Sequence, residues 1–239
     1  MRIRIKFRKY GVMRFIGHLD IMRYFQKAMR RANIDIAYSE GFSPHQIMSF
    51  AAPLGVGITS DGEYLDIEAN STKSTEESIT ALNAVMVDGI EITEYVALHQ
   101  DAKKAMTSVA AADYIVYFKN QVDFTQEELE GKIQTYYEEQ DAIEVTKQTK
   151  KSERVIDIKP LIYAFRPCEV KELGWQGFFL QLSTGSTDNI KPELVLQDFY
   201  QYFGKEYDSF NMQIHRVETY ERTKDGLRPL YQAGDVIES

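Results

Sequence analysis

Residues 2–8 read RIRIKFR, and they alternate basic and apolar side chains without a break. Ile3, Ile5 and Phe7 fall on one side of an extended chain, and the basic residues fall on the other. Alternation with a period of two is typical of a strand that buries one face. We therefore expect a half-buried strand with a wholly basic outer face, formed by Arg2, Arg4, Lys6 and Arg8.

A helix is predicted to follow this strand, from about His18 to Asn33. Apolar residues recur at helical spacing along one side of it, among them Ile21, Phe25 and Met29. The opposite side carries Arg23, Lys27, Arg30 and Arg31. The strand and the helix therefore predict two basic surfaces on consecutive elements.

The remaining pattern suggests one order of elements used twice, with a weakly periodic linker over residues 99–110. The first half continues with extended pieces at 34–38 and 47–51, a strand at 63–69, a helix from 74 to about 87 and a strand at 90–98. The second half has strands at 114–118, 143–149, 154–158, 178–183 and 212–220 and helices at 125–139 and 192–203. Residues 160–167 do not fit the minimal pattern.

With one of the three extended segments between its helices set aside, each half follows the order β-α-β-β-α-β, which is that of the ferredoxin-like fold. We expect an α+β protein made of tandem ferredoxin-like units with antiparallel sheets. The expected domains are a basic N-terminal subdomain over 1–100, an acidic C-terminal subdomain over 111–222 and a flexible tail over 223–239. A single larger α+β sheet is the alternative, because no residue-level repeat relates the two halves.

Charge is divided unevenly along the chain. The first 31 residues contain ten basic residues and one acidic residue, a formal charge of +9, and the other 208 contain 18 basic and 35 acidic residues, a charge of −17. Arginine-rich surfaces bind phosphate groups and give salt-dependent affinity for nucleic acids. The candidate nucleic-acid-binding residues are Arg2, Arg4, Lys6, Arg14, Arg23, Lys27, Arg30 and Arg31. Aromatic residues that could stack on bases are Tyr10, Phe15, Tyr24 and Phe42. The alternative is that the basic residues pair with the acidic remainder of the chain or with an acidic protein.

Composition also bears on location and cofactors. No apolar run approaches the roughly 18 residues that cross a bilayer, and the alternating N-terminus lacks the continuous apolar segment of a signal peptide. We therefore expect a cytoplasmic protein without a membrane partner. The single cysteine, Cys168, excludes a multi-cysteine metal or iron–sulfur site built by this chain alone. We expect neither a cofactor nor a metal site.

Two of the four histidines, His18 and His45, lie near the basic segment. Because histidine titrates near neutrality, this pair could act as acid and base in phosphodiester cleavage, and with Asp20 it could bind a metal ion. The simpler interpretation gives His18 the capping position of the helix and His45 a hydrogen bond that stabilises the turn at Pro44. The sequence leaves catalysis open, because nothing in it fixes the separation of the two rings.

Several short motifs carry a resemblance to a known family. They are RFIGHLD (14–20), RRA (30–32), AYSEGFSPH (37–45), MSFA (48–51), PLGVG (53–57) and EYLDIE (63–68), with later stretches at 144–147 and 157–160. In these residues the chain resembles a bacterial family of unknown function known as radical-SAM-linked proteins. It departs from many members at Ser43, where they have Asn, and at Gln46-Ile47, where they have Pro-Lys.

The resemblance implies a protein partner. Members of this family are found fused or linked to a radical SAM protein with a cobalamin-type domain, whereas this chain lacks the CxxxCxxC motif that would hold the cluster. The resemblance suggests a site around His18, Asp20, Arg30, Arg31, Ser39, Phe42 and His45, and Ser43 belongs to the same motif. We therefore expect a non-catalytic accessory or substrate-recognition partner of a radical SAM system. It would bind RNA, such as tRNA or rRNA, or another polyanion. An RNA-processing enzyme that uses His18 and His45 and a pure protein-interaction module are the alternatives.

Overall fold

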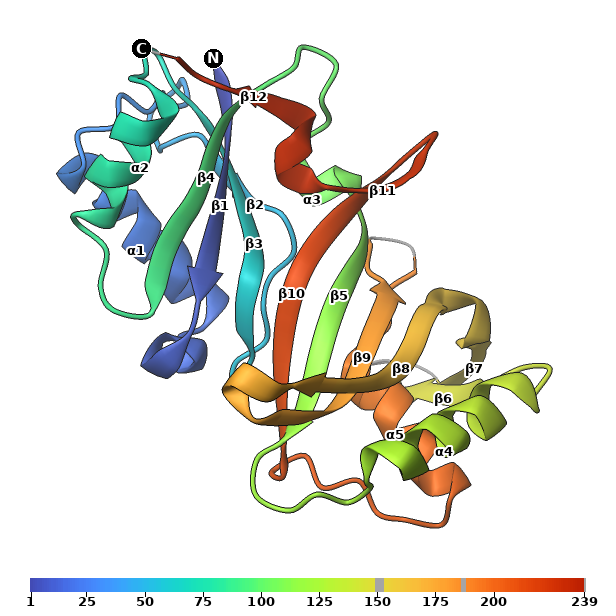
Figure 1. Ribbon diagram of the computed structural model, residues 1–239. Coiled ribbons are helices and arrows are strands. Elements are labelled where there is room, and N and C mark those ends of the chain that lie inside the picture. Colours follow the sequence, from blue (N-terminus) through green and yellow to red (C-terminus); the bar gives the residue numbers. More distant parts are fainter. Residues whose placement is uncertain (149–152, 186–187, 239) are drawn as a thin grey trace. The chain divides into compact units, whose positions relative to one another are not determined.

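The structure is a computed structural model that describes residues 1–148, 153–185 and 188–238. It is a mixed α+β protein with mostly antiparallel strands and, in these ranges, five α-helices (Figure 1). The α+β class expected from the sequence is confirmed. Two compact units divide the chain: the first comprises residues 1–110 and the segment from Arg216 onward, and the second comprises residues 111–215. No helix of the described ranges has the length and apolarity needed to span a membrane.

The first unit is built around three long antiparallel strands. Its elements are β1 (Arg2–Lys9), η1 (Gly11–Phe15), α1 (His18–Arg31), β2 (Met48–Phe50), β3 (Thr59–Glu68), α2 (Thr75–Asn83), β4 (Ile90–Leu98), α3 (Ala105–Ser108), the later part of β10 (Met212–Thr223), β11 (Gly226–Pro229), η4 (Leu230–Ala233) and β12 (Gly234–Val236). β1 lies between β3 and β4 and pairs with both in antiparallel orientation. β2 pairs with the end of β3, where Met48 lies opposite Ile67. These strands therefore follow the order β4-β1-β3-β2.

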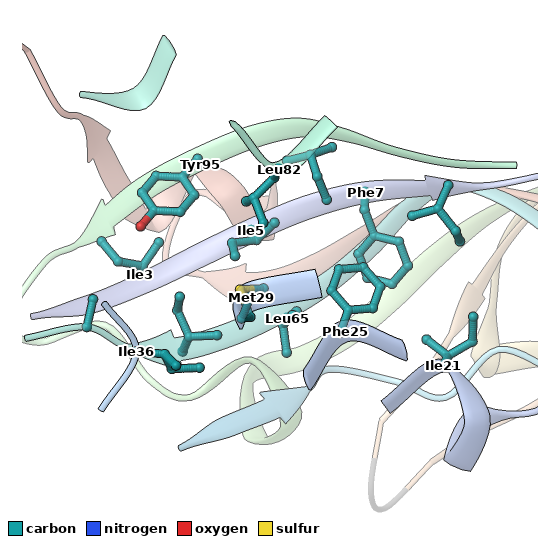
Figure 2. Close-up of a cluster of buried hydrophobic side chains, with 14 residues drawn as sticks. Ile3, Ile5, Phe7, Ile21, Phe25, Met29, Ile36, Leu65, Leu82 and Tyr95 are labelled. Atoms are coloured by element: carbon teal, nitrogen blue, oxygen red, sulfur yellow. The ribbon is translucent and has the colours of Figure 1, made fainter. Parts of the chain in front are cut away.

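The apolar side of β1 forms the centre of the main hydrophobic core of this unit. Ile3, Ile5 and Phe7 are at most 2% exposed, as the alternation predicts. α1 packs Phe25 and Met29 against them (Figure 2), and the rings of Phe7 and Phe25 lie 4.7 Å apart. Because α1 buries this side, its basic side is left facing away from the core.

The extended piece expected at residues 34–38 does not form a strand. It makes two isolated bridges, Ile36 to Ala69 and Tyr38 to Gln46, in place of a continuous ladder. The N–H of Ala37 donates to the carbonyl oxygen of Glu68, and the carbonyl oxygen of Ala37 accepts the N–H of Ile47. The piece therefore contacts the end of β3 and the residues just before β2 at single points, on its way into the loop at residues 39–45.

The C-terminal segment differs from the flexible tail expected over 223–239. β11 pairs with the end of β10, β12 pairs with β4, and Leu230 and Ala233 are buried. A side chain at Gly234 would meet the carbonyl oxygen of Ala97 at 2.4 Å, so this strand approach requires glycine. The expected boundary at residue 222 also shifts, because the first unit takes the chain from Arg216 onward. Leu230 and Ala233 stand among polar residues and become buried only through contacts with distant strands. Local sequence patterns do not reveal such contacts.

The second unit is a smaller α+β body. Its elements are β5 (Val109–Phe118), α4 (Gln126–Glu138), β6 (Glu144–Gln148), β7 (Glu153–Asp157), η2 (Lys159–Leu161), β8 (Ile162–Val170), η3 (Lys171–Leu173), β9 (Trp175–Ser183), α5 (Pro192–Tyr202) and the beginning of β10. β9 pairs in antiparallel orientation with β5 and with β8. The strand order is β10-β5-β9-β8, and β6 and β7 form a separate two-stranded sheet.

This arrangement corrects the expected roles of the segments between α4 and α5. β6 and β7, both predicted as strands of this half, lie outside the larger sheet, and residues 160–167 supply most of β8. β9 carries the buried side chains of Phe178, Leu180 and Leu182, whereas β7 is largely exposed. The β6–β7 hairpin and the β8–β9 hairpin both have strand-like composition. Burial against α4 and α5 therefore decides which hairpin joins the larger sheet. The predicted turn at 150–152 lies outside the described residues.

Tyr64 belongs to a second buried cluster of the first unit, with Ala51, Ala105 and Leu230. Its hydroxyl group donates a hydrogen bond of 2.6 Å to Oε1 of Glu218. Burial, and next the negative charge of Glu218, raise the pKa of Tyr64 well above its ordinary value. The folded state therefore keeps a proton that the unfolded chain releases at high pH.

We expect the free energy of unfolding to fall as the pH rises above about 10, because the unfolded state then binds fewer protons than the folded state. Tyr64→Phe should make this decline shallower, by up to about 1.4 kcal/mol per pH unit. Urea denaturation between about pH 8 and pH 11 measures the slope. Tyr38→Phe, at an exposed position, is the control. An unchanged slope in Tyr64→Phe would contradict the role given to this hydroxyl group.

Candidate functional site

The outer side of β1 faces other parts of the first unit. Arg4 is fully buried, and its guanidinium group binds Asp66 through Nε to Oδ1 at 2.8 Å and Nη2 to Oδ2 at 3.0 Å. It also donates to the carbonyl oxygens of Leu230 and Lys103 at 2.9 Å each. Asp66 accepts in addition the backbone N–H of Ala105 at 2.7 Å. A buried charge is tolerated when it is paired and hydrogen-bonded in this way, so Arg4 holds these segments in place.

Arg2 holds the connection between β4 and α3. Its guanidinium group donates to the carbonyl oxygens of His99, Gln100 and Ala102 at 2.8, 3.1 and 2.7 Å. Together with Arg4 it fixes much of residues 99–105, within the segment expected to be a linker. Arg2 and Arg4, both predicted to contact phosphate, therefore bind the backbone of a neighbouring loop.

Lys6 and Arg8 complete the internal pairing of β1. Nζ of Lys6 lies 2.6 Å from Oε2 of Glu218, and Arg8 binds Asp61 at 2.8 Å and Glu91 at 2.9 Å. The hydrogen bond to Asp61, supported by Glu91, raises the pKa of Arg8 above its ordinary value. The outer row of β1 thus follows the alternative in which basic residues pair within the chain. A period-two pattern identifies a polar face, and it does not distinguish water from a neighbouring segment.

α1 presents the basic surface that stays exposed. We name four of its exposed residues the α1 basic face: Arg23, Lys27, Arg30 and Arg31. Arg23 makes one exposed contact with Asp20 at 3.4 Å, and Arg31 donates to the carbonyl oxygen of Val85 at 3.1 Å. Within the described part of the chain, the side chains of Lys27 and Arg30 have no hydrogen bond or ion pair. Their charges are therefore available to a ligand.

The predicted aromatic residues divide into held and exposed side chains. Tyr24 donates to the sulfur of Met86 and accepts the N–H of Val87 at 2.8 Å, so it is part of the fold. Phe15, which ends η1 just before α1, is 59% exposed. The guanidinium carbon of Arg14 lies 4.8 Å from the centre of the Phe15 ring. A cation and an exposed ring therefore stand at the N-terminal end of α1.

His18 is the first residue of α1 and packs against Phe50, with ring centroids 5.3 Å apart. The capping role considered for it is wrong, because Gly17 occupies the N-cap position. His18 lines a cavity of about 20 Å³ with Lys9 and Glu63. Burial lowers the pKa of Lys9 from its ordinary value, and the charge of Glu63 partly offsets this effect. A cavity of this size holds about one water molecule, so it does not admit a substrate.

Residues 39–45 form a braced loop. The N–H of Ser39 donates to the carbonyl oxygen of His45 at 2.8 Å, and the N–H of His45 donates to Oγ of Ser39 at 3.1 Å. Oγ of Ser39 and Nδ1 of His45 lie 2.8 Å apart. This geometry agrees with the turn-stabilising role considered for His45. Phe42 is fully exposed near the middle of the loop, beside the exposed Ser43.

The two candidate catalytic histidines line different cavities. Neither of these cavities brings the two rings together, as acid–base catalysis by this pair would need. Asp20 is exposed and contacts Arg23. Among the residues that the structure describes, no group of three or more His, Cys, Asp or Glu side chains is placed to hold a metal ion.

A larger cavity, which we name the sheet cavity, lies beside the Arg4–Asp66 pair and has a volume of about 230 Å³. Its polar lining residues include Arg2, His45, Ser49, Asp66, Glu68 and Lys104. Of these, sequence reasoning singled out Arg2 and His45 individually and missed Ser49, Glu68 and Lys104. The usable signal was the motif EYLDIE, in which Asp66 and Glu68 alternate with apolar residues and therefore share one face of a strand.

Comparison with known proteins identifies a family without an assigned activity. Residues 2–192, most of the chain, match the model of a family described as an uncharacterized protein conserved in bacteria (DUF2344). No curated protein matches the chain. The matched region contains α1 and every residue named above for the sheet cavity.

Asp66→Ala should lower the free energy of unfolding by about 3–5 kcal/mol, because it leaves the buried guanidinium group of Arg4 without its partner. Asp61→Ala removes a partner of Arg8, whose side chain is 41% exposed, and should cost about 1 kcal/mol or less. Urea denaturation followed by circular dichroism compares the two variants. Equal losses would contradict the structural role of the buried pair.

Proposed function

The chain belongs to DUF2344, a family of uncharacterized conserved bacterial proteins, and from that premise we propose that it binds RNA or another polyanion through the α1 basic face. In this proposal it is a cytoplasmic, non-catalytic accessory protein. The observation that carries the proposal is the contrast between two sets of basic residues. The outer row of β1 is bonded internally, whereas Lys27 and Arg30 on α1 have no partner among the described residues.

The chemistry of the α1 basic face suits phosphate groups. Three of its four residues are arginines, and a guanidinium group binds phosphate oxygens through two parallel hydrogen bonds. Arg23, Lys27 and Arg30 recur at spacings of four and three, which places them along one side of a helix. Arg23 and Arg30 are separated by about 10 Å along the helix axis. Such a row can contact neighbouring phosphates of one strand.

Exposed aromatic contact favours RNA over an acidic protein. Phe15 lies just ahead of α1, with Arg14 over its ring. Unpaired bases stack on exposed rings and on guanidinium groups, and acidic side chains do not. An unpaired segment of RNA therefore uses both Phe15 and the α1 basic face.

We further propose that each unit is ferredoxin-like. In the first unit the order β4-β1-β3-β2, with α1 and α2 between the strands, supports this assignment. In the second unit the order β10-β5-β9-β8 supports it, with β6 and β7 as an inserted hairpin. Both orders place the first and third sheet strands in the middle, as a split β-α-β arrangement requires.

The proposed RNA binding is tested by fluorescence anisotropy with labelled tRNA and labelled single-stranded RNA at several salt concentrations. Arg23→Ala/Lys27→Ala/Arg30→Ala should weaken binding strongly. It should also reduce the slope of log K against log salt by about 2, because each lost phosphate contact removes about 0.7. The matched control, Lys171→Ala/Lys191→Ala/Lys224→Ala, removes the same charge at exposed positions elsewhere and should keep the slope.

The stacking contact is tested separately. Phe15→Leu should weaken binding of single-stranded RNA by about tenfold and leave the salt slope unchanged. Absence of RNA binding by the unaltered protein at low salt would overturn the proposal. So would equal slopes in the α1 triple variant and the unaltered protein.

The second part of the proposal is a radical SAM partner, supported by the resemblance of residues 14–20 and 37–45 to radical-SAM-linked proteins. With one cysteine, the chain cannot supply the cysteine set of an iron–sulfur cluster by itself. The partner would therefore carry the radical chemistry, and this chain would present the substrate.

Co-expression with the cobalamin-type radical SAM protein of the same bacterium tests this part. We expect a complex that survives size-exclusion chromatography after ribonuclease treatment, because the contact is between proteins. Elution of the two proteins as separate species at micromolar concentration would contradict the partnership and leave RNA binding unaffected.

A further inference from the structure

The sheet cavity lies on the face of the first unit's sheet opposite to α1. In the ladder between β1 and β3, Arg2 lies opposite Glu68, and Arg4 lies opposite Asp66. Side chains alternate along a strand, so these residues face away from the core that contains Ile3. The cavity is therefore separate from the α1 basic face, and its function is independent of the proposed RNA binding.

One row of cross-strand neighbours lines the cavity. Glu68 lies between Arg2 on β1 and Ile47, whose carbonyl oxygen accepts the N–H of Glu68 at 3.1 Å. On the other side of Arg2, the alternation of β4 places Leu98 on the same face. Above this row, α3 brings Met106 to the cavity. The row thus combines charged groups with an apolar wall.

The position of α3 is fixed by the buried pair. The backbone N–H of Ala105, the first residue of α3, donates to Asp66, and the preceding carbonyl group of Lys103 accepts from Arg4. Lys104 and Met106 flank Ala105, so their backbone positions are set before any ligand arrives. A preorganised site loses less entropy on binding.

Three polar groups in the cavity have no assigned role in the fold. In the described part of the chain, the carboxylate of Glu68 and the ammonium group of Lys104 have no hydrogen bond or ion pair. Oγ of Ser49 is buried and has no partner there either. Glu68 is half-buried and Lys104 is exposed, whereas the hydroxyl group of Ser49 is a buried group of the kind that native proteins normally satisfy. An unused anion, an unused cation and a buried hydroxyl group in one cavity point to a ligand with both charges.

We propose that the sheet cavity binds a small zwitterion, an α-amino acid with an apolar side chain. Its ammonium group pairs with Glu68, its carboxylate pairs with Lys104, and its side chain packs against Leu98 and Met106. The volume of about 230 Å³ is below the ~300–1,000 Å³ of sites for drug-sized molecules. It therefore suits a ligand of amino-acid size.

Isothermal titration calorimetry of the full chain tests the ligand class with L-leucine, L-methionine and L-phenylalanine. We expect at least one of them to bind. Two analogues of leucine lack one charge each: 4-methylpentanoate lacks the ammonium group, and 3-methylbutylamine lacks the carboxylate. For leucine as the ligand, each analogue should bind at least about tenfold more weakly, because a charged hydrogen bond is lost. Absence of binding by all three amino acids at millimolar concentration overturns the proposal.

Variants test the placement of the charges. Glu68→Gln should weaken amino-acid binding at least about tenfold and leave the binding of 4-methylpentanoate unaffected. Lys104→Gln should also weaken amino-acid binding at least about tenfold, and it should leave the binding of 3-methylbutylamine unaffected. Met106→Trp should fill the cavity and abolish binding. Glu76→Gln, on the exposed side of α2, is the matched control and should change nothing. Binding that is unaltered in Glu68→Gln or in Met106→Trp places the ligand elsewhere and overturns the assignment.

Discussion

The buried ion pair between Arg4 and Asp66 is the constraint on which the first unit depends. A guanidinium group without access to water needs acceptors for its N–H groups, and Arg4 donates to Asp66, Leu230 and Lys103. Each acceptor belongs to a different segment, so one side chain decides which segments meet. Because apolar replacements of buried pairs are often as stable, we infer that this pair mainly specifies the arrangement. Any other arrangement would leave a buried charge without its partner.

Local periodicity predicts the buried side of β1, the exposed basic side of α1 and the general order of elements. Ile3 and Phe25 are buried and Lys27 is exposed, as their spacing requires. The same periodicity could not place Arg4, because its acceptors lie 62 and 226 positions away in Asp66 and Leu230. It also could not choose between the two hairpins of the second unit, because that choice depends on what each hairpin packs against.

The candidate site was predicted in part, for a related reason. A charge count treats Arg4 and Arg30 as equivalent, although one is buried and the other is exposed. It also assigns Glu68 to an acidic background, although Glu68 faces a cavity beside a buried pair. His18 and His45 stand out by residue type, but their separation depends on tertiary contacts. Residue type suggests possible chemistry, and burial decides which side chains are available for it.

The contact between Arg4 and Leu230 also bears on the order of events during synthesis. The ribosome makes β1 before residues 99–105, and η4 and β12 are made later still. Until then, one acceptor of the Arg4 guanidinium group is missing and the edge of β4 that β12 covers is open. Residues 111–215 are synthesised within this interval. The second unit therefore has all of its residues before the first does, and translation imposes an order of completion opposite to the order of the domains along the chain.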